Sequence, residues 1–245
     1  MEFNEVLLKR RSIRAFADTP VPRERVEALL ARALESPSWS NTQPYKVALA
    51  MGDDLLFLRE ALSQRFERLV ALQKAPLPVK LWRALRGGSG MPDGDFKPIL
   101  TYPEDLQPRR MATGLALYKL LGIGREDKAA RHEQMARNFR FFDAPVALFV
   151  FVHDGLGVYS ALDAGIFIQS LMLAATDEGL GSCAQGALAL WRSPVAERFA
   201  IPGHYKLLCG VALGYPLAEA PINRFRPERR ALAEILLPPA GRGTN

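Results

Sequence analysis

The sequence of 245 residues contains no run of about 18 or more apolar residues, so we expect no transmembrane helix. Its first residues, MEFNEVLLKRRS, place acidic residues before the first basic one, and their apolar run is too short for a signal peptide. Cys183 and Cys209 are its only cysteines, too few for a disulfide framework in a chain of this length. These absences predict a cytoplasmic protein that does not bind a membrane.

The common signatures of enzyme chemistry are also missing. There is no GxGxxG after a strand, no GxxxxGKS/T loop, no GxSxG turn and no HExxH helix. The three histidines, His132, His153 and His204, show no metal-binding spacing, so we expect no metal site. No histidine supports Cys183 as a nucleophile, which favours a buried structural thiol. Since no pair of catalytic carboxylates stands out either, the chain shows no hydrolytic machinery of its own.

Basic residues outnumber acidic residues by 32 to 26, and much of the excess lies at 9–14 and 224–230. A basic balance suits nucleic acid, an anionic membrane or an anionic small ligand. A nucleic-acid-binding protein more often interleaves aromatic residues through a broad basic surface. Two compact clusters far apart in the sequence favour a phosphate pocket instead. A basic nucleic-acid-binding module stays open as the less favoured alternative.

The first basic cluster follows a short apolar segment near the N-terminus. Asn4 can cap a helix over about 5–12, in which Arg10 and Arg14 share a face if the helix persists. The guanidinium groups of Arg10, Arg11 and Arg14 are planar forked donors that match phosphate oxygens, and Ser12 adds a hydroxyl. The alternative interpretation is a solvated helix end, because cations also favour a helix C-terminus.

Helices and strands do not alternate regularly, which favours an α+β fold over a doubly wound sheet. The helix expected over 159–178 is apolar on nearly all sides, so we expect it to run through the centre of the molecule. Pro22 suits the first turn of a helix that ends before Pro37. The other expected elements are strands at 45–51, 144–152 and 205–215, helices beginning at Asp53 and Ser193 and spanning 111–122 and 126–138, and a short strand or turn in SCAQGAL.

The chain is expected to form a single domain, residues 1–245, with an excursion rich in proline and glycine at about 71–110. This stretch is too long for an ordinary connection, so we interpret it as a lid or an excursion over a partner. Trp82, Phe96 and Tyr102 can line a cavity for an aromatic molecule or merely anchor a surface loop. The apolar C-terminal stretch ALAEILLPP is expected to pack on something else, such as another subunit.

A polar turn, SPSWSNTQP, precedes the strand at 45–51. The side-chain amides of Asn41 and Gln43 each supply a donor and an acceptor edge, which can pair with a flat heterocycle bearing N–H and C=O groups. The alternative is a turn whose side chains cap its own backbone.

Five stretches, taken together, resemble the flavin-dependent nitroreductase family. They are RRSIRAF, VPRERVEALLARALESPSWSNTQPYKVALA, GLGSCAQGAL, GVALGYP and INRFRPERRALAEIL, and they match in order and spacing over nearly the whole chain except about 71–110. The resemblance implies an α+β fold with a mainly antiparallel central sheet flanked by helices. It also implies an intertwined homodimer that binds FMN non-covalently in two pockets at the dimer interface.

The resemblance assigns FMN-binding roles to residues from four parts of the chain. The RRSxR motif implies that Arg10, Arg11, Ser12 and Arg14 hold the phosphate and the pyrimidine end of the ring. Part of the turn at 37–43 is expected to reach the flavin of the other subunit. The backbone of Gln185 and Gly186 is expected near flavin N5 and O4, and Arg229, or less securely Arg226, near the phosphate. The implied residues of the turn are Pro37, Ser38, Trp39, Asn41 and Gln43.

The implied chemistry is a ping-pong reaction in which NAD(P)H reduces FMN and an electron-poor acceptor then takes two electrons in the same cleft. Nitroaromatics and quinones are the implied acceptors. The cofactor performs the difficult step, so no side chain is expected to be catalytic, and Arg14 and Gly186 are expected to tune the flavin. The same fold also supports reductive dehalogenation, cyclic amine oxidation and flavin fragmentation, and a flavin-binding protein without turnover is a further alternative.

Overall fold

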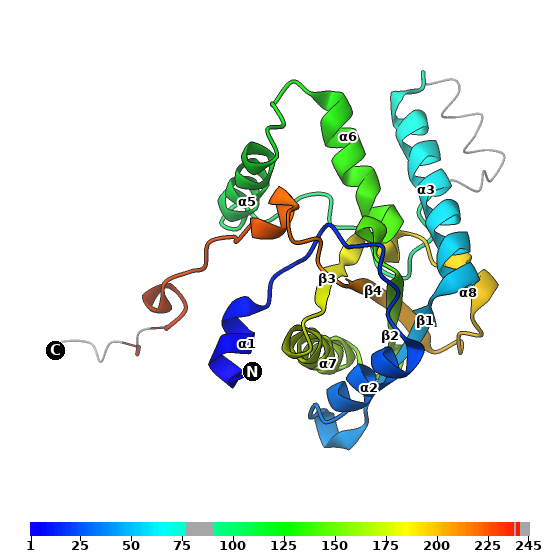
Figure 1. Ribbon diagram of the computed structural model, residues 1–245, viewed down its shortest axis with the longest axis vertical. Helices are drawn as coiled ribbons and strands as arrows, with labels where there is room; N and C mark the ends of the chain where they lie inside the picture. Colours follow the sequence, from blue (N-terminus) through cyan, green and yellow to red (C-terminus); the bar gives the residue numbers. More distant parts are fainter. Residues whose placement is uncertain (77–90, 238, 241–245) are drawn as a thin grey trace.

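The computed structural model describes residues 1–76, 91–237 and 239–240. Its centre is a four-stranded sheet with the strand order β1-β2-β4-β3 (Figure 1). Neighbouring strands are antiparallel throughout, which confirms the predicted α+β fold with a mainly antiparallel sheet. The strands are β1 (Tyr45–Ala50), β2 (Val146–His153), β3 (Gly181–Gln185) and β4 (Tyr205–Gly214).

The central strand β2 is buried on both faces of the sheet, as its continuous apolar sequence predicts. Successive side chains of a strand point to opposite faces, so β2 contributes to two separate hydrophobic clusters. The two sets are Val146, Leu148, Val150 and Val152 on one face and Ala147, Phe149 and Phe151 on the other.

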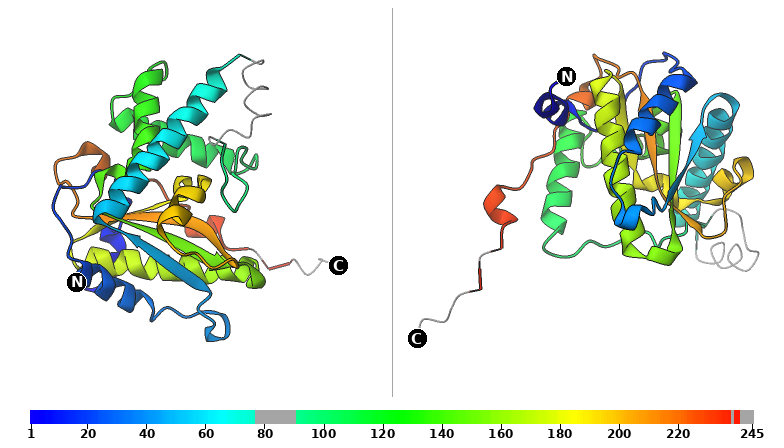
Figure 2. Two further views of the ribbon diagram at one scale, coloured as in Figure 1. Left: turned by 90° about the vertical axis from the view of Figure 1, so that its right-hand side faces the viewer. Right: turned by 90° about the horizontal axis from the view of Figure 1, so that it is seen from below.

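Helices cover both faces of the sheet. Figure 2 shows α2 and α7 below the sheet in its left view and α3 above it. The helix α8 packs beside α3, and α6 also lies on the α3 side. The described residues form the α-helices α1 (Phe3–Lys9), α2 (Arg23–Ala33), α3 (Gly52–Lys74), α5 (Gln107–Leu120), α6 (Lys128–Ala136), α7 (Val158–Asp177) and α8 (Ser193–Arg198). Short 3-10 helices are η1 (Trp39–Asn41), η2 (Arg137–Asp143), η3 (Asp154–Leu156), η4 (Gly186–Leu190), η5 (Pro221–Arg224) and η6 (Leu232–Glu234).

The long helix α7 is open to solvent only over its first turns, because Ile166 to Thr176 are all buried or half-buried. Phe167 and Leu171 are buried against the sheet and α2, whereas Leu162 is 56% exposed and Val158 is 74% exposed. The prediction that this helix runs through the centre is therefore wrong only for its first turns, since the helix otherwise packs against the sheet, α2 and α1. By length and hydropathy α7 could cross a membrane, but its buried side packs as the core helix of a globular fold does.

Two predicted helix boundaries are wrong. The first helix ends at Lys9, because Arg10 already has a non-helical backbone, and Asn4 lies inside that helix rather than capping it. Arg10 and Arg14 therefore do not share a helix face. The helix expected from 111 begins at Gln107, since Pro108 occupies the first turn, where proline is tolerated.

Both ends of the stretch at about 71–110, for which an excursion was predicted, are helical. Its first residues complete α3, which ends at Lys74, and its last residues begin α5. Trp82 lies outside the described residues. Phe96 is 49% exposed, and Tyr102 lines a cavity against α5.

The two ends of the chain meet at the edge strand β3. Ile13 donates its backbone N–H to the carbonyl of Ser182 at 2.9 Å, so the segment after α1 runs parallel to β3. Farther along, the N-terminal segment pairs with the segment that follows β4. The backbone N–H of Ala17 donates to the carbonyl of Tyr215, and the N–H of Leu217 donates to the carbonyl of Ala15. The N-terminal segment is thereby held between β3 and the C-terminal segment that follows β4.

Candidate functional site

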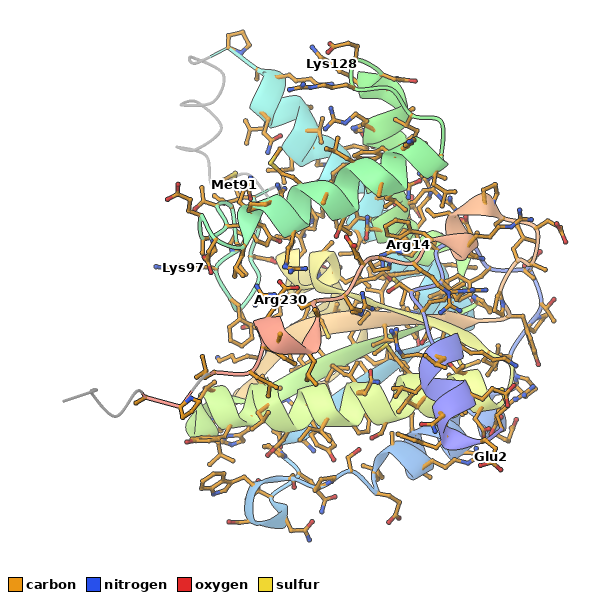
Figure 3. All side chains as sticks on the ribbon, turned by 90° about the vertical axis from the view of Figure 1, so that its left-hand side faces the viewer. Glu2, Arg14, Met91, Lys97, Lys128 and Arg230 are labelled. Carbon is orange, nitrogen blue, oxygen red and sulfur yellow. The ribbon has the colours of Figure 1, made fainter. Side chains whose placement is uncertain are left out.

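A cavity of about 440 Å³ lies where the N-terminal and C-terminal segments meet. Its cationic lining comes from both ends of the chain, and one residue, Gln169, comes from α7. Figure 3 labels Arg14 on the N-terminal segment and Arg230 on the C-terminal segment; Arg230 follows the cavity residue Arg229 and does not itself line the cavity. The lining residues are Leu7, Leu8, Arg10, Arg11, Ser12, Arg14, Gln169, Phe225, Arg226, Pro227 and Arg229.

The extended backbone after α1 places the first arginines along this cavity. Ser12 pairs with Ser182 in a parallel bridge, so Arg14, two residues farther on, lies at the level of Ala184 on β3. The backbone N–H of Arg14 donates to Oδ1 of Asn223 at 2.8 Å. Strand pairing on one side and a side-chain amide on the other therefore hold this segment in place.

The C-terminal arginines approach from η5 onward. Phe225 is buried at 8% exposure and anchors the segment. Nη1 of Arg226 donates to the carbonyl of Leu8 at 2.7 Å, at the end of α1, and Nη1 of Arg229 donates to the carbonyl of Pro227 at 3.0 Å. Both guanidinium groups thus bond to backbone carbonyls, and neither forms an ion pair with an acid of the described residues.

The cavity is strongly electropositive. Burial, followed by the charges of Arg229 and Arg226, lowers the pKa of Arg10. Within the described ranges, no ion pair involves any of the five arginines that line the cavity. Like charges that crowd together without a carboxylate destabilise one another, and a bound anion removes that cost. The residues present therefore fit a phosphate group.

The strand β3, which pairs with the arginine-bearing segment at Ser182, ends at Gln185. Gln185 is buried, and its Nε2 donates to the carbonyl of Asn138 at 2.9 Å, whereas its Oε1 has no hydrogen-bond partner among the described residues. Gly186 is exposed, and an added Cβ there meets no atom within 4 Å. An unsatisfied buried acceptor beside an open backbone segment is typical of a ligand-binding surface.

Cys183 lies on β3 beside the first cluster. Burial raises the pKa of its thiol, and the opposing influences of Arg14 and Ser12 are smaller. The thiol therefore stays protonated at neutral pH, as expected for a structural cysteine rather than a nucleophile.

The polar turn at 37–43 lies elsewhere, near the start of α7. The hydroxyl of Ser38 accepts the N–H of Gln43 at 3.0 Å, and Nε2 of Gln43 donates to Oδ1 of Asn41 at 3.1 Å. In this chain the turn therefore bonds to itself, which is the alternative interpretation of its amides. The predicted site residues here, Pro37 included, do not line the arginine cavity.

The same turn carries backbone strain and an exposed ring. Ser40, Asn41 and Gln43 have positive φ values of 48°, 55° and 46°. The backbone N–H of Trp39 donates to Oδ2 of the buried Asp163 at 3.1 Å, and the ring centroids of Trp39 and Tyr159 lie 4.5 Å apart. Left-handed non-glycine residues of this kind are often found at functional sites.

Sequence reasoning missed three residues of the site, namely Asn223, Gln169 and Phe225. Asn223 is 3% exposed and bonds to Arg14, Ala15 and Leu217. No periodicity distinguishes this asparagine from an ordinary turn residue. Its motif, INRF, was part of the resemblance, but its role depends on which strands meet around it.

The family model described as "Nitroreductase family" matches residues 7–215 of this chain. The chain belongs to the nitroreductase family. The matched range includes the first arginine cluster, the whole sheet and the end of β3. It stops before the C-terminal arginines, which only the fold brings to the same cavity. The predicted family is therefore confirmed.

Similar proteins cover this nitroreductase-family chain almost from end to end. A 4-nitrobenzoate reductase from Nocardioides sp. (strain LMS-CY) is 32% identical over 90% of this chain and 83% of its own length. A 4-nitrobenzoate reductase from Pseudomonas putida is 31% identical over 93% of this chain and 91% of its own. The crystal structure of an FMN and NADPH-dependent nitroreductase, NfnB from Sphigopyxis sp. strain HMH, has a TM-score of 0.81 at 32% identity. The similarity covers 98% of this chain and 100% of the NfnB chain.

Proposed function

We propose that this protein is an FMN-dependent oxidoreductase that uses NAD(P)H to reduce nitroaromatics, quinones or similarly electron-poor acceptors. The observation that carries the proposal is the cavity in which five arginines gather without an acidic partner among the described residues. Relatives of similar length are a 4-nitrobenzoate reductase and an FMN and NADPH-dependent nitroreductase. A cationic cavity of this kind supplies what the phosphate of FMN requires.

The arginine cavity would hold the FMN phosphate from both sides. Arg10, Arg11 and Ser12 approach from the N-terminal segment, and Arg226 and Arg229 approach from the C-terminal segment. Arginine stays protonated at any relevant pH, and each hydrogen bond to a charged group contributes about 1.5–3 kcal/mol. Several such bonds can therefore retain the cofactor without a covalent link.

Bound FMN supplies a centre that accepts a hydride from NAD(P)H and passes two electrons to the acceptor. For a nitroaromatic, the balanced reaction is NAD(P)H + H⁺ + ArNO2 giving NAD(P)⁺ + ArNO + H2O. Arg14 and the backbone of Gly186 would orient the cofactor and stabilise added negative charge, because both lie along the open end of β3. No other side chain is assigned a catalytic role.

A homodimer is part of this proposal. Exposed apolar side chains gather over the first turns of α7, at Val158, Tyr159 and Leu162, and along the C-terminal tail, where Leu236 is 62% exposed and Leu237 is 92% exposed. Such surfaces mark interfaces between subunits. In a dimer, Trp39, Asn41 and Gln43 would approach the cofactor of the partner subunit, which would explain why they lie away from the arginine cavity of their own chain. Function in the cytoplasm belongs to the same proposal.

The test is to purify the protein and follow its visible flavin absorbance. NAD(P)H should bleach the yellow colour without oxygen, a nitroarene or quinone should restore it, and initial rates should follow ping-pong kinetics. A colourless protein that carries nucleic acid and releases it with salt would contradict the proposal and favour a nucleic-acid-binding module. A yellow protein that NAD(P)H does not bleach would contradict the proposed reduction and favour a flavin-binding protein without turnover.

A further inference from the structure

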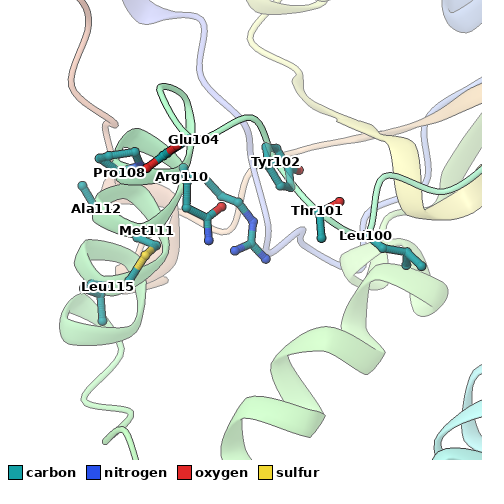
Figure 4. A pocket seen from close by; sticks show the side chains of 10 residues that line it. Leu100, Thr101, Tyr102, Glu104, Pro108, Arg110, Met111, Ala112 and Leu115 are labelled. Atoms are coloured by element: carbon teal, nitrogen blue, oxygen red, sulfur yellow. The ribbon is translucent and has the colours of Figure 1, made fainter.

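A second cavity, of about 730 Å³, lies between α5 and the segment that leads into it. Figure 4 shows Tyr102 and Arg110 pointing into the space between these two parts of the chain. Leu100, Met111 and Leu115 supply apolar surface around it. Its volume lies within the range of about 300–1,000 Å³ that is typical of small-molecule sites, and the cavity is open to solvent, with Tyr102 41% and Leu115 61% exposed.

Arg110 is the cation of this cavity. The carbon at the centre of its guanidinium lies 4.8 Å from the centroid of the Tyr102 ring. Its sequence neighbour Arg109 forms an ion pair with Glu234, whereas no ion pair within the described ranges involves Arg110. Glu104 also lines the cavity but forms no ion pair with Arg110. The aromatic ring therefore positions a guanidinium whose charge is available to a ligand.

The chemistry of this cavity selects a particular kind of molecule. A guanidinium presents paired N–H donors that match a carboxylate with two parallel hydrogen bonds. Flat apolar surface around Tyr102, together with the polarizable sulfur of Met111, suits an aromatic ring. An aromatic ring with one carboxylate satisfies both requirements at once.

The cavity is also linked to the arginine cavity through the fold. The helix α5 packs against η5, and Asn223 of η5 holds the backbone of Arg14. The two cavities thus flank the same C-terminal segment, with the cationic one placed for a phosphate and the apolar one for a ring.

The geometry points to Arg110 as a specificity-determining residue that binds the carboxylate of an aromatic acceptor over Tyr102. This inference rests on the proposed function, since it names the acceptor class of that reaction. It separates acceptors by charge: nitrobenzoates should be preferred over neutral nitroarenes of the same size.

The experiment compares 4-nitrobenzoate with its methyl ester in the holoenzyme. Arg110→Gln should lower kcat/KM for the acid about 10- to 100-fold, mainly through KM, and change kcat/KM for the ester less than about twofold. Arg109→Gln is the matched control, because it removes the same charge from the adjacent position. It should leave kcat/KM unchanged for both the acid and the ester. Arg110→Lys keeps the charge without the fork and should restore part of the loss. Titration of benzoate into the oxidised holoenzyme should show the same order of binding.

Equal losses for the acid and the ester would overturn the inference. So would a rise in KM for NADPH with no change for NADH, because the anion at Arg110 would then be the phosphate of the nucleotide. A wild-type enzyme that reduces neither of these acceptors and no quinone would refute the proposed function itself. If the wild-type enzyme has the same kcat/KM for the ester and for the acid, only the role of Arg110 is refuted.

Discussion

Asn223→Ala should loosen the segment that carries the first arginine cluster. The side chain of Asn223 accepts hydrogen bonds from the N–H groups of Arg14 and Ala15, at 2.8 and 3.1 Å. It donates to the carbonyls of Ala15 and Leu217, at 2.7 and 3.0 Å. One buried amide therefore joins the N-terminal segment to the segment after β4.

The magnitude follows from burial and from the number of bonds lost. Asn223 and Ala15 are 3% and 5% exposed, so water does not easily replace the missing amide. A buried polar group left without a partner costs about 1–3 kcal/mol. Since the segment can relax after truncation, we expect the free energy of unfolding to fall by about 2–4 kcal/mol.

FMN binding should weaken as well, because Arg14 loses one of its two anchors. The measurement is urea unfolding of the apoprotein and the holoprotein, together with FMN titration followed by quenching of flavin fluorescence. Asn4→Ala is the matched control, because Asn4 is exposed on α1 and forms no side-chain hydrogen bond within the described residues. Asn223→Ala with unchanged unfolding energy and unchanged FMN affinity would refute the reasoning. A loss of stability alone, with FMN affinity intact at temperatures where the variant is folded, would separate the fold from the site.

Two further predictions concern charge and pH. Arg10→Gln should weaken FMN binding about 10- to 100-fold and leave the apoprotein as stable as the wild type or more stable. Burial and repulsion from Arg229 and Arg226 disfavour the charge of Arg10, so its removal relieves a cost in the apoprotein. A destabilised apoprotein in thermal unfolding would contradict this. Burial raises the pKa of Cys209 from 9.0 to about 11, so the thiol contribution to stability is complete below pH 9 and should decline as the pH rises from 9 to 11, where the unfolded chain ionises first. Urea midpoints across this pH range should show a smaller decline in Cys209→Val, and an equal decline would rule out the thiol as a cause.

The core of the fold was predictable from the sequence because its signals are local. The run APVALFVFV predicted a buried strand, and β2 is that strand. The strand expected at 205–215 is β4, and the helix expected from Asp53 is α3, in which Leu55, Leu58 and Leu62 are buried. The spacing of apolar residues along the chain carries this information, because it indicates whether a strand or a helix turns those side chains toward the core.

Predictions that depended on partners were less successful. The first helix was expected to span about 5–12 and so to include Arg10 and Arg11, but it ends at Lys9. Pairing of Ser12 and Ile13 with Ser182 draws the chain into an extended conformation instead. The helix α5 was expected to start after Pro108, although proline fits its first turn.

By itself, the sequence determined the strands, most of the helices and the kind of chemistry, because apolar period, arginine forks and family motifs are properties of neighbouring residues. Only the tertiary structure decided that Arg10 and Arg229 share one cavity, that Asn223 holds the two chain ends together, and that Arg110 lies over Tyr102. The physical reason is that charge repulsion, buried hydrogen bonds and ring contacts depend on distance in space. Arg10 and Arg229, like Arg14 and Asn223, are about two hundred positions apart, and such pairs acquire these distances only when the sheet and its flanking segments have folded.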